Sequence, residues 1–251
     1  MFDLNLEQQF KQHALAEYPK EACGLIVDGN TFVPMKNVHE TPKINFRMNT
    51  RELLEYHKDG RVNALLHSHT GPDNNYPSRA DMKVQNEMQI PWGIVHIGPG
   101  RYMDGVFYFG DQVPIAPFVG RAFRPGVHDC YTLLRDIYRA ERNIVLPIFP
   151  REGYWWKDRQ DILKANFTKA GFVQIDKSQL QKHDVMLCRV NCPPENQVYN
   201  HIAVLRDKGM IFHHLNKRLS RPDPAQAWLS TSDMYLRYKG IGGNADASGE
   251  E

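Results

Sequence analysis

The first hundred residues alternate between helical and extended hydrophobic patterns. Apolar side chains at Phe2, Leu6, Phe10, Ala14 and Tyr18 recur every four positions, which predicts a helix over 2–18 that Pro19 ends. The stretch "ACGLIVDGNTFVPMKNV" predicts two strands around a turn at 28–30. The same reasoning predicts helices in "TRELLEYHKDGR" and "SRADMKVQNEMQ" and strands in "VNALLHSH", "WGIVHIG" and "GVFYFG".

A segment without helical or strand periodicity separates these elements from a second set in the other half of the chain. Residues 110–126, "GDQVPIAPFVGRAFRPG", contain three prolines and three glycines, which is typical of a linker. A helix is predicted in "DCYTLLRDIYRAERN", another near 157–170, and strands in "DVMLCRV", "NHIAVLR" and "MIFHHL". We therefore expect an α+β protein with domains over 1–110 and 125–239, a linker over 111–124 and a disordered polar tail over 240–251.

Composition narrows the function classes. The 251 residues leave room for two domains, and with 41% hydrophobic residues each can bury a core. A formal net charge of +2 and the absence of a basic run argue against nucleic-acid binding through phosphate contacts. No run of about 18 apolar residues occurs, so we expect no membrane span. The amphipathic N-terminus does not look like a secretion signal, and the four cysteines form no CxxC pair, which indicates reduced thiols in a chain made in a cytoplasm.

The stretch "HSHTGPDNNYPSRAD" over 67–81 is the first candidate site. Alternate strand residues point to one face, so His67 and His69 can both reach one metal ion. Asp81, in the first turn of the next predicted helix, can supply a third ligand and leave the fourth tetrahedral position to water. Glu21 is the candidate general base, and Ser78 is a candidate hydrogen-bond donor to an oxyanion. The alternative is a pair of surface histidines without a metal.

Glu21, "HSH" and the S-x-x-D step from Ser78 to Asp81 resemble the JAMM/MPN metallopeptidase family over residues 5–110. This resemblance implies one zinc ion on His67, His69 and Asp81, with Glu21 activating water and Ser78 assisting the oxyanion. The chain departs from the family pattern twice. The gap between His69 and Ser78 is one residue longer than usual, and Thr70 stands where proline is common. The extra residue can bulge out in the "GPDNN" loop without moving the helix.

Cys130 opens the second candidate site. A cysteine nucleophile needs a thiolate, which a helix N-terminus and a nearby histidine both favour, and Cys130 starts the predicted helix "CYTLLRDIY". His201 begins one apolar strand, and His213 and His214 end the next, so a hairpin would bring either of these two beside His201. The alternative for Cys130 is a small core residue.

The succession "DCYTLL", "LQKHDVMLCRV", "NHIAVL" and "IFHH" resembles the NlpC-type cysteine peptidase family over about 118–238. That family has a papain-like α+β fold and hydrolyses amide bonds of bacterial wall peptides, commonly between D-γ-glutamate and diaminopimelate. The resemblance implies a Cys130, His201, His213 triad, because the family spacing selects His213 over His214. Phe123 stands where the family often has a tyrosine.

A JAMM/MPN domain followed by an NlpC-type domain in one chain resembles a family of tail-tip assembly proteins from lambda-like siphophages. The resemblance implies a protein that is made and assembled in the host cytoplasm. This combination implies other tail-tip proteins and peptidoglycan stem peptide as partners, and a place at the virion tail tip. Three alternatives stay open: a structural tail-tip protein with weak or inactive domains, an isopeptidase for a ubiquitin-like tag, and a DNA-repair protein, which the near-neutral charge does not support.

Overall fold

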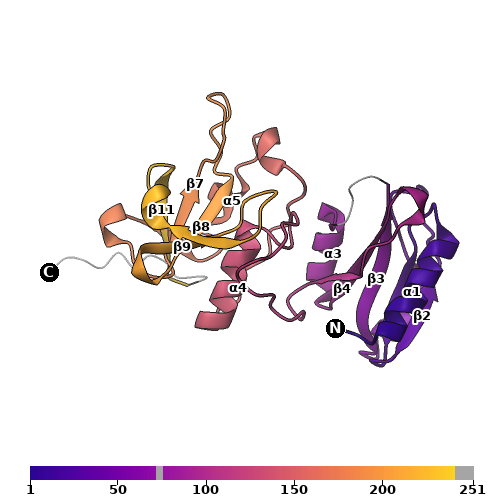
Figure 1. Ribbon diagram of the computed structural model, residues 1–251. Helices are drawn as coiled ribbons and strands as arrows, with labels where there is room; N and C mark the ends of the chain where they lie inside the picture. The colour runs from indigo at the N-terminus through magenta and orange to yellow at the C-terminus, as the bar shows by residue number, and fades with distance from the viewer. Residues whose placement is uncertain (72–75, 241–251) are drawn as a thin grey trace. The chain divides into compact units, whose positions relative to one another are not determined.

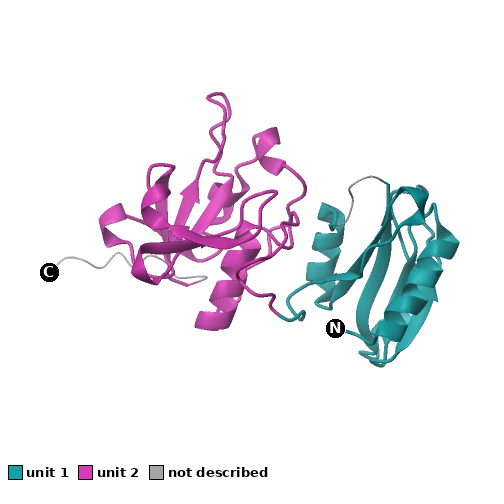
Figure 2. Ribbon diagram, viewed as in Figure 1, with its two compact units in different colours: residues 1–114 teal, residues 115–251 magenta. Residues whose placement is uncertain are grey.

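A computed structural model describes residues 1–71 and 76–240 of the chain (Figure 1). It divides into two compact units, residues 1–114 and 115–251 (Figure 2), which confirms the expected two-domain α+β architecture. The division falls within 111–124, the segment expected to link the domains. The predicted bulge in the loop after Gly71 and the predicted disordered tail lie largely outside the described residues.

The first unit is a five-stranded sheet with the strand order β2-β1-β3-β4-β5. Helix α1 places Leu6, Phe10 and Ala14 against strand residues such as Ile26 and Leu66, which explains the four-residue spacing of its apolar side chains. The elements of this unit are α1 (Leu4–Glu17), β1 (Cys23–Val27), β2 (Thr31–Met35), α2 (Thr50–His57), β3 (Val62–Thr70), α3 (Arg79–Met88), β4 (Trp92–Ile97), η1 (Pro99–Arg101) and β5 (Phe107–Phe109).

Strand β3 is the central strand and carries the histidines of the first candidate site. It pairs antiparallel with β1, with Cys23 opposite His67, and parallel with β4, with His69 opposite His96. Continuing the β1–β3 register by two residues brings Glu21 opposite His69. The sheet thus gathers residues from two separate strands at one end of β3.

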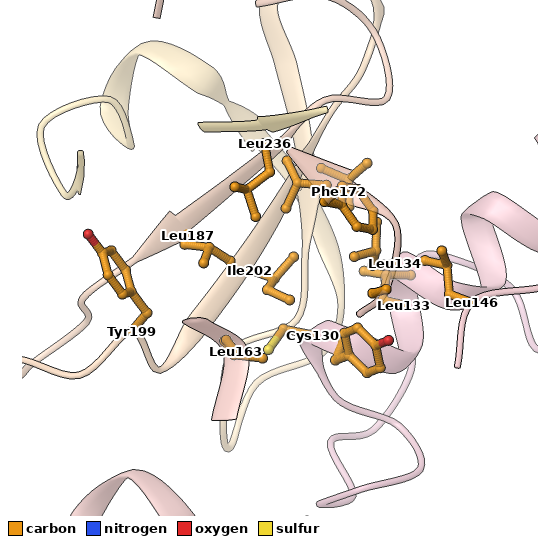
Figure 3. Close-up of a cluster of buried hydrophobic side chains, with 14 of the residues drawn as sticks. Cys130, Leu133, Leu134, Leu146, Leu163, Phe172, Leu187, Tyr199, Ile202 and Leu236 are labelled. Carbon is orange, nitrogen blue, oxygen red and sulfur yellow. The ribbon is translucent and has the colours of Figure 1, made fainter. Parts of the chain in front are cut away.

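The second unit is a six-stranded antiparallel sheet with the order β10-β9-β8-β7-β11-β6. Helix α4 packs against β8 through an apolar cluster that includes Leu133, Leu134 and Ile202 (Figure 3). The elements are α4 (Cys130–Arg142), η2 (Trp155–Asp158), α5 (Ile162–Asn166), β6 (Phe172–Ile175), η3 (Lys177–Gln179), β7 (Val185–Cys188), β8 (His201–Leu205), η4 (Asp207–Gly209), β9 (Met210–His213), β10 (Arg221–Pro224), η5 (Ala225–Ala227) and β11 (Ser232–Tyr238).

Two expectations for this unit were wrong. The helix expected near 157–170 is a 3-10 turn followed by the five-residue helix α5. The sheet also has six strands where three were expected, because β6, β10 and β11 were not recognised. Strand β10 reads "RPDP", and its two prolines are tolerated because it lies at the edge of the sheet. Among the described residues, no helix is long and apolar enough to cross a membrane.

Candidate functional sites

The structure brings His67, His69 and Asp81 together in the first unit. The Nε2 atoms of the two histidines lie 3.0 Å apart, and the Oδ2 atom of Asp81 lies 3.5 Å from Nε2 of His67 and 3.3 Å from that of His69. All three side chains are buried. His67 is enclosed further by the rings of Phe46 and Trp92, at 4.5 and 5.6 Å between centroids.

These separations fit a metal ion. Three ligands of a tetrahedral zinc ion at about 2.0–2.1 Å lie about 3.3–3.4 Å from one another, close to the three distances observed here. Burial lowers the pKa of His67, so its ring is neutral and can offer a lone pair. Burial alone would raise the pKa of Asp81, but the two histidines hold it well below its ordinary value, so this carboxylate is ionised. The set can therefore supply two imidazoles and one carboxylate to a cation.

Helix α3 fixes the position of Asp81 through a reciprocal cap. The hydroxyl of Ser78 accepts a hydrogen bond from the backbone N–H of Asp81 at 3.1 Å, and Oδ2 of Asp81 accepts one from the backbone N–H of Ser78 at 2.7 Å. The Ser78 hydroxyl proton is not used in this cap and can be donated elsewhere. Despite the longer loop before Ser78, the helix delivers Asp81 to both histidines.

Glu21 lies beside this cluster and is 3% exposed. Burial raises its pKa to about 7; the charge of Asp81 adds to this shift and that of His69 opposes it. A carboxyl group with a pKa near neutrality can both accept and release a proton at physiological pH. The structure therefore brings the three predicted ligands together, with Glu21 close enough to feel the charges of His69 and Asp81 and with Ser78 at the start of the helix that carries Asp81.

The second unit contains a cavity of about 600 Å³ that both Cys130 and His201 line. Cys130 is 8% exposed and belongs to the edge of the apolar cluster, beside Leu163 and Ile202 (Figure 3). The backbone N–H groups of Ile202 and Tyr131 lie close enough to its sulfur to favour the thiolate, although burial outweighs them. Since Ile202 directly follows His201, the thiol lies next to the start of β8.

A relay of side chains leads away from His201. Its Nε2 atom lies 3.2 Å from Nδ1 of His213, and Nε2 of His213 lies 3.1 Å from Oδ2 of Asp223. The indole of Trp228 covers both rings, at 5.3 Å from the His201 centroid and 4.5 Å from that of His213. Asp223 was not among the residues predicted from the sequence, because it lies in the proline-flanked strand β10.

A buried ion pair stands directly before Cys130. Arg151 donates two hydrogen bonds to the carboxylate of Asp129, from Nε at 2.7 Å and from Nη2 at 2.6 Å. Asp129 also caps α4 by accepting from the backbone N–H of Thr132. The pair therefore fixes the first turn of the helix that carries the thiol.

The thiol and imidazole are both neutral in the free protein. Burial raises the pKa of Cys130 to about 12, and the charge of Asp129 adds to this shift. Burial also lowers the pKa of His201 well below its ordinary value, as do His213 and His214. The two pKa shifts favour the neutral thiol and the neutral imidazole, which suits general-base activation of the thiol better than a preformed ion pair.

His214 lies outside the relay but lines the same cavity. Its ring meets that of Phe123 edge to face, at 5.2 Å between centroids. Phe123 also lines the cavity, so the position at which the family often has a tyrosine faces the candidate site without a hydroxyl.

Basic side chains dominate the charge of the cavity wall. Five basic residues line it, of which Arg151 is paired with the acidic lining residue Asp129 and Arg221 is paired with Asp223; the other three are Lys157, Lys217 and Arg218. The excess of positive charge favours a ligand that carries carboxylates.

Comparison with known proteins supports the family expected for each half of the chain. Residues 3–106 match the family of prokaryotic homologs of the JAB domain, and residues 116–237 match the NlpC/P60 family. The tail tip assembly protein K of Escherichia phage lambda is 33% identical over 193 residues, which cover 76% of this chain and 89% of that protein. The protein of the same name from Escherichia phage N15 is 26% identical over 239 residues, or 92% and 93% of the two chains.

The fold and the two clusters of polar residues thus define a two-domain protein that joins a JAB domain to an NlpC/P60 domain. Within that class, the chain belongs to the family of tail tip assembly protein K.

Proposed function

We propose that this protein is a component of a phage tail tip whose NlpC/P60 domain is a cysteine peptidase acting on peptidoglycan stem peptides during genome entry. The observation that carries the proposal is the cavity shared by Cys130 and His201, behind which His213 lies in hydrogen-bonding range of His201. The basic wall of this cavity supports an acidic peptide as the substrate.

In the proposed reaction the sulfur of Cys130 attacks the carbonyl carbon of the scissile amide, and its proton passes to His201. Because Nε2 of His201 bonds His213, Nδ1 is the nitrogen left to take this proton. His201 then gives the proton to the leaving amine, and a thioester forms. Water next releases the acid product and restores the thiol, with His201 again accepting and returning the proton.

The JAB domain is proposed to hold one zinc ion on His67, His69 and Asp81, whose separations suit tetrahedral coordination. When bound, zinc supplies an acidified water and polarises a carbonyl oxygen. Glu21, buried beside that centre, would accept and return a proton, and the hydroxyl proton of Ser78, which the helix cap does not use, would stabilise an oxyanion. The substrate of this domain is proposed to be a tail or wall peptide.

The names of the relatives support other tail proteins as partners and the virion tail tip as the location. Assembly in the host cytoplasm is part of the same proposal. A second candidate function is a structural tail-tip component with inactive domains. The low exposure and high pKa of Cys130, and phenylalanine at position 123, favour this candidate.

Incubation with defined muropeptides, with and without a chelator and a thiol-blocking reagent, separates these proposals. The cysteine peptidase proposal predicts cleavage of the stem peptide that survives the chelator and disappears on thiol blocking. Cleavage that is lost with the chelator alone would assign the activity to the JAB domain, and no cleavage under any condition would favour the structural role.

A further inference from the structure

Asp223 is the last member of the relay that starts at His201, and its surroundings restrict which atoms can carry protons. Its Oδ2 atom accepts a hydrogen bond from Nη2 of Arg221 at 3.0 Å and lies 3.1 Å from Nε2 of His213. The indole of Trp228 also lies close enough to this carboxylate to favour its ionised form. Although burial acts in the opposite direction, these hydrogen bonds and the nearby charges lower the pKa of Asp223, so the carboxylate is ionised.

An ionised carboxylate has only acceptor atoms. Nε2 of His213 must therefore be the nitrogen that carries a proton and donates it to Asp223. Asp223 raises the pKa of His213, but burial outweighs this effect and, together with the charges of Arg221 and Arg218, lowers the pKa and disfavours a second ring proton. In the neutral ring Nδ1 is then bare and can only accept.

The tautomer of His213 in turn determines the tautomer of His201. Because Nδ1 of His213 accepts, Nε2 of His201 must donate across the 3.2 Å that separates them. His201 is also neutral, since burial keeps its pKa well below the ordinary value. Its Nδ1 atom is therefore bare, which is the state that a base for the Cys130 thiol requires.

We propose that Asp223 is a positioning residue that selects, through His213, the tautomer of His201 in which Nδ1 is free to accept the thiol proton. This inference rests on the proposed peptidase function for its catalytic consequence, but the tautomers can be observed without turnover. With Asp223 removed, His213 can hold its proton on Nδ1 instead. That proton would point at His201 and drive the His201 proton onto Nδ1, where it would block the base.

Nitrogen-15 NMR of the histidine rings tests the proposal directly, because protonated and bare ring nitrogens have different chemical shifts. In the unsubstituted protein we expect protonated Nε2 and bare Nδ1 for both His201 and His213. In Asp223→Ala we expect His213 to carry its proton on Nδ1 as well as on Nε2, so that a single tautomer is no longer observed. Asp223→Asn keeps an oxygen that can accept from Arg221 and His213, and we expect it to retain the original tautomer.

Kinetics on a defined muropeptide supply the second readout. Asp223→Ala should lower kcat about 10- to 100-fold with KM changed less than about twofold, as loss of an orienting partner does, while Asp223→Asn loses less. Asp207→Ala is the matched control, because it removes a carboxylate of the same domain that forms an exposed pair with Lys182. We expect this variant to keep the kcat of the wild type.

A wild-type spectrum with a bare Nε2 on His201 would overturn the inference, as would an Asp223→Ala variant with unchanged tautomers and kcat. A wild-type protein without any turnover would instead overturn the proposed peptidase function. The ring spectra would still decide the role of Asp223 in that case, so the two failures are distinguishable.

Discussion

The Nε2 atom of His201 lies 3.2 Å from the Nδ1 atom of His213, across the hairpin of β8 and β9. Both rings are buried under Trp228, so water does not compete for this contact. The contact leaves one nitrogen of His201 for a second partner at the cavity that Cys130 also lines. The chemistry proposed for the second domain depends on this pair.

The neutral thiol of Cys130 leads to a prediction for its reactivity. Thiolates, not thiols, are alkylated, and the pKa of Cys130 is raised to about 12 by burial and by Asp129. Without substrate, we expect iodoacetamide at pH 8 to modify the half-buried Cys192 before Cys130, and the rate at Cys130 to rise up to the highest pH that the fold tolerates. Peptide mass spectrometry measures each rate separately. A fast reaction of Cys130 that levels off below pH 7 would show a preformed thiolate instead.

The geometry of the first site predicts a zinc content near one ion per chain. The His67→Ala variant should lose the ion, because it removes one of three converging ligands. Elemental analysis of protein purified without added metal measures this content, and His57→Ala, at an exposed position on α2, is the matched control that should keep zinc. Equal zinc in both variants would contradict the assigned ligands.

Ser78 should affect both stability and metal affinity. Ser78→Ala removes the acceptor that caps α3, and we expect a loss of about 1 kcal/mol in the free energy of unfolding of the first domain. The hydroxyl also fixes the backbone of Asp81, so zinc affinity should fall, although the backbone N–H of residue 78 still binds the Asp81 carboxylate. Chemical denaturation and zinc titration measure the two effects. A variant with full zinc affinity would show that Asp81 is held without the cap.

The buried pair of Asp129 and Arg151 should dominate the stability around Cys130. Arg151→Met leaves the carboxylate buried without its partner, and we expect a loss of about 3–5 kcal/mol in the free energy of unfolding. The double variant with Asp129→Asn should recover much of this loss. Lys182→Met, which breaks an exposed pair with Asp207, should change stability by less than about 1 kcal/mol. Equal losses of stability in Arg151→Met and Lys182→Met would contradict the role assigned to the buried pair.

The same pair sets a dependence on pH. Burial favours the protonated form of Asp129, but the charge and hydrogen bonds of Arg151 outweigh this effect and lower the folded-state pKa of Asp129 below its unfolded value of about 3.9. Its contribution is therefore fully present above about pH 4 and is lost as the pH falls through the lower folded-state pKa. Acid titration of the Arg151→Met, Asp129→Asn double variant should show a shallower loss of stability than that of the wild type.

The sequence was sufficient where the site residues follow a local rule. His67 and His69 share a strand face by simple alternation, and Asp81 follows from the first turn of a capped helix. The two-domain α+β architecture was also predictable, because each half carries its own set of helical and extended patterns.

Other features of the fold and the site were not predicted from the sequence. Asp223 reaches His213 only because β10 pairs with β9, and nothing in "RPDP" indicates a strand by pattern. The helix expected near 157–170 breaks because residues 159–161 leave the helical path, and only Ile162–Asn166 forms a short α-helix. Strand β10 thus forms through its pairing with β9, whereas the helix is interrupted locally, by the left-handed backbone of Arg159 and by Asp161, which caps α5.

Release of stem-peptide fragments from purified sacculi by matched cysteine variants tests the central claim most directly. If the sulfur at position 130 is the nucleophile, Cys130→Ala releases no fragments while its circular dichroism and thermal unfolding match those of the wild type. Cys192→Ala, which removes a thiol that does not line the cavity, should release fragments at the wild-type rate. Undiminished release by Cys130→Ala would contradict the thiol mechanism.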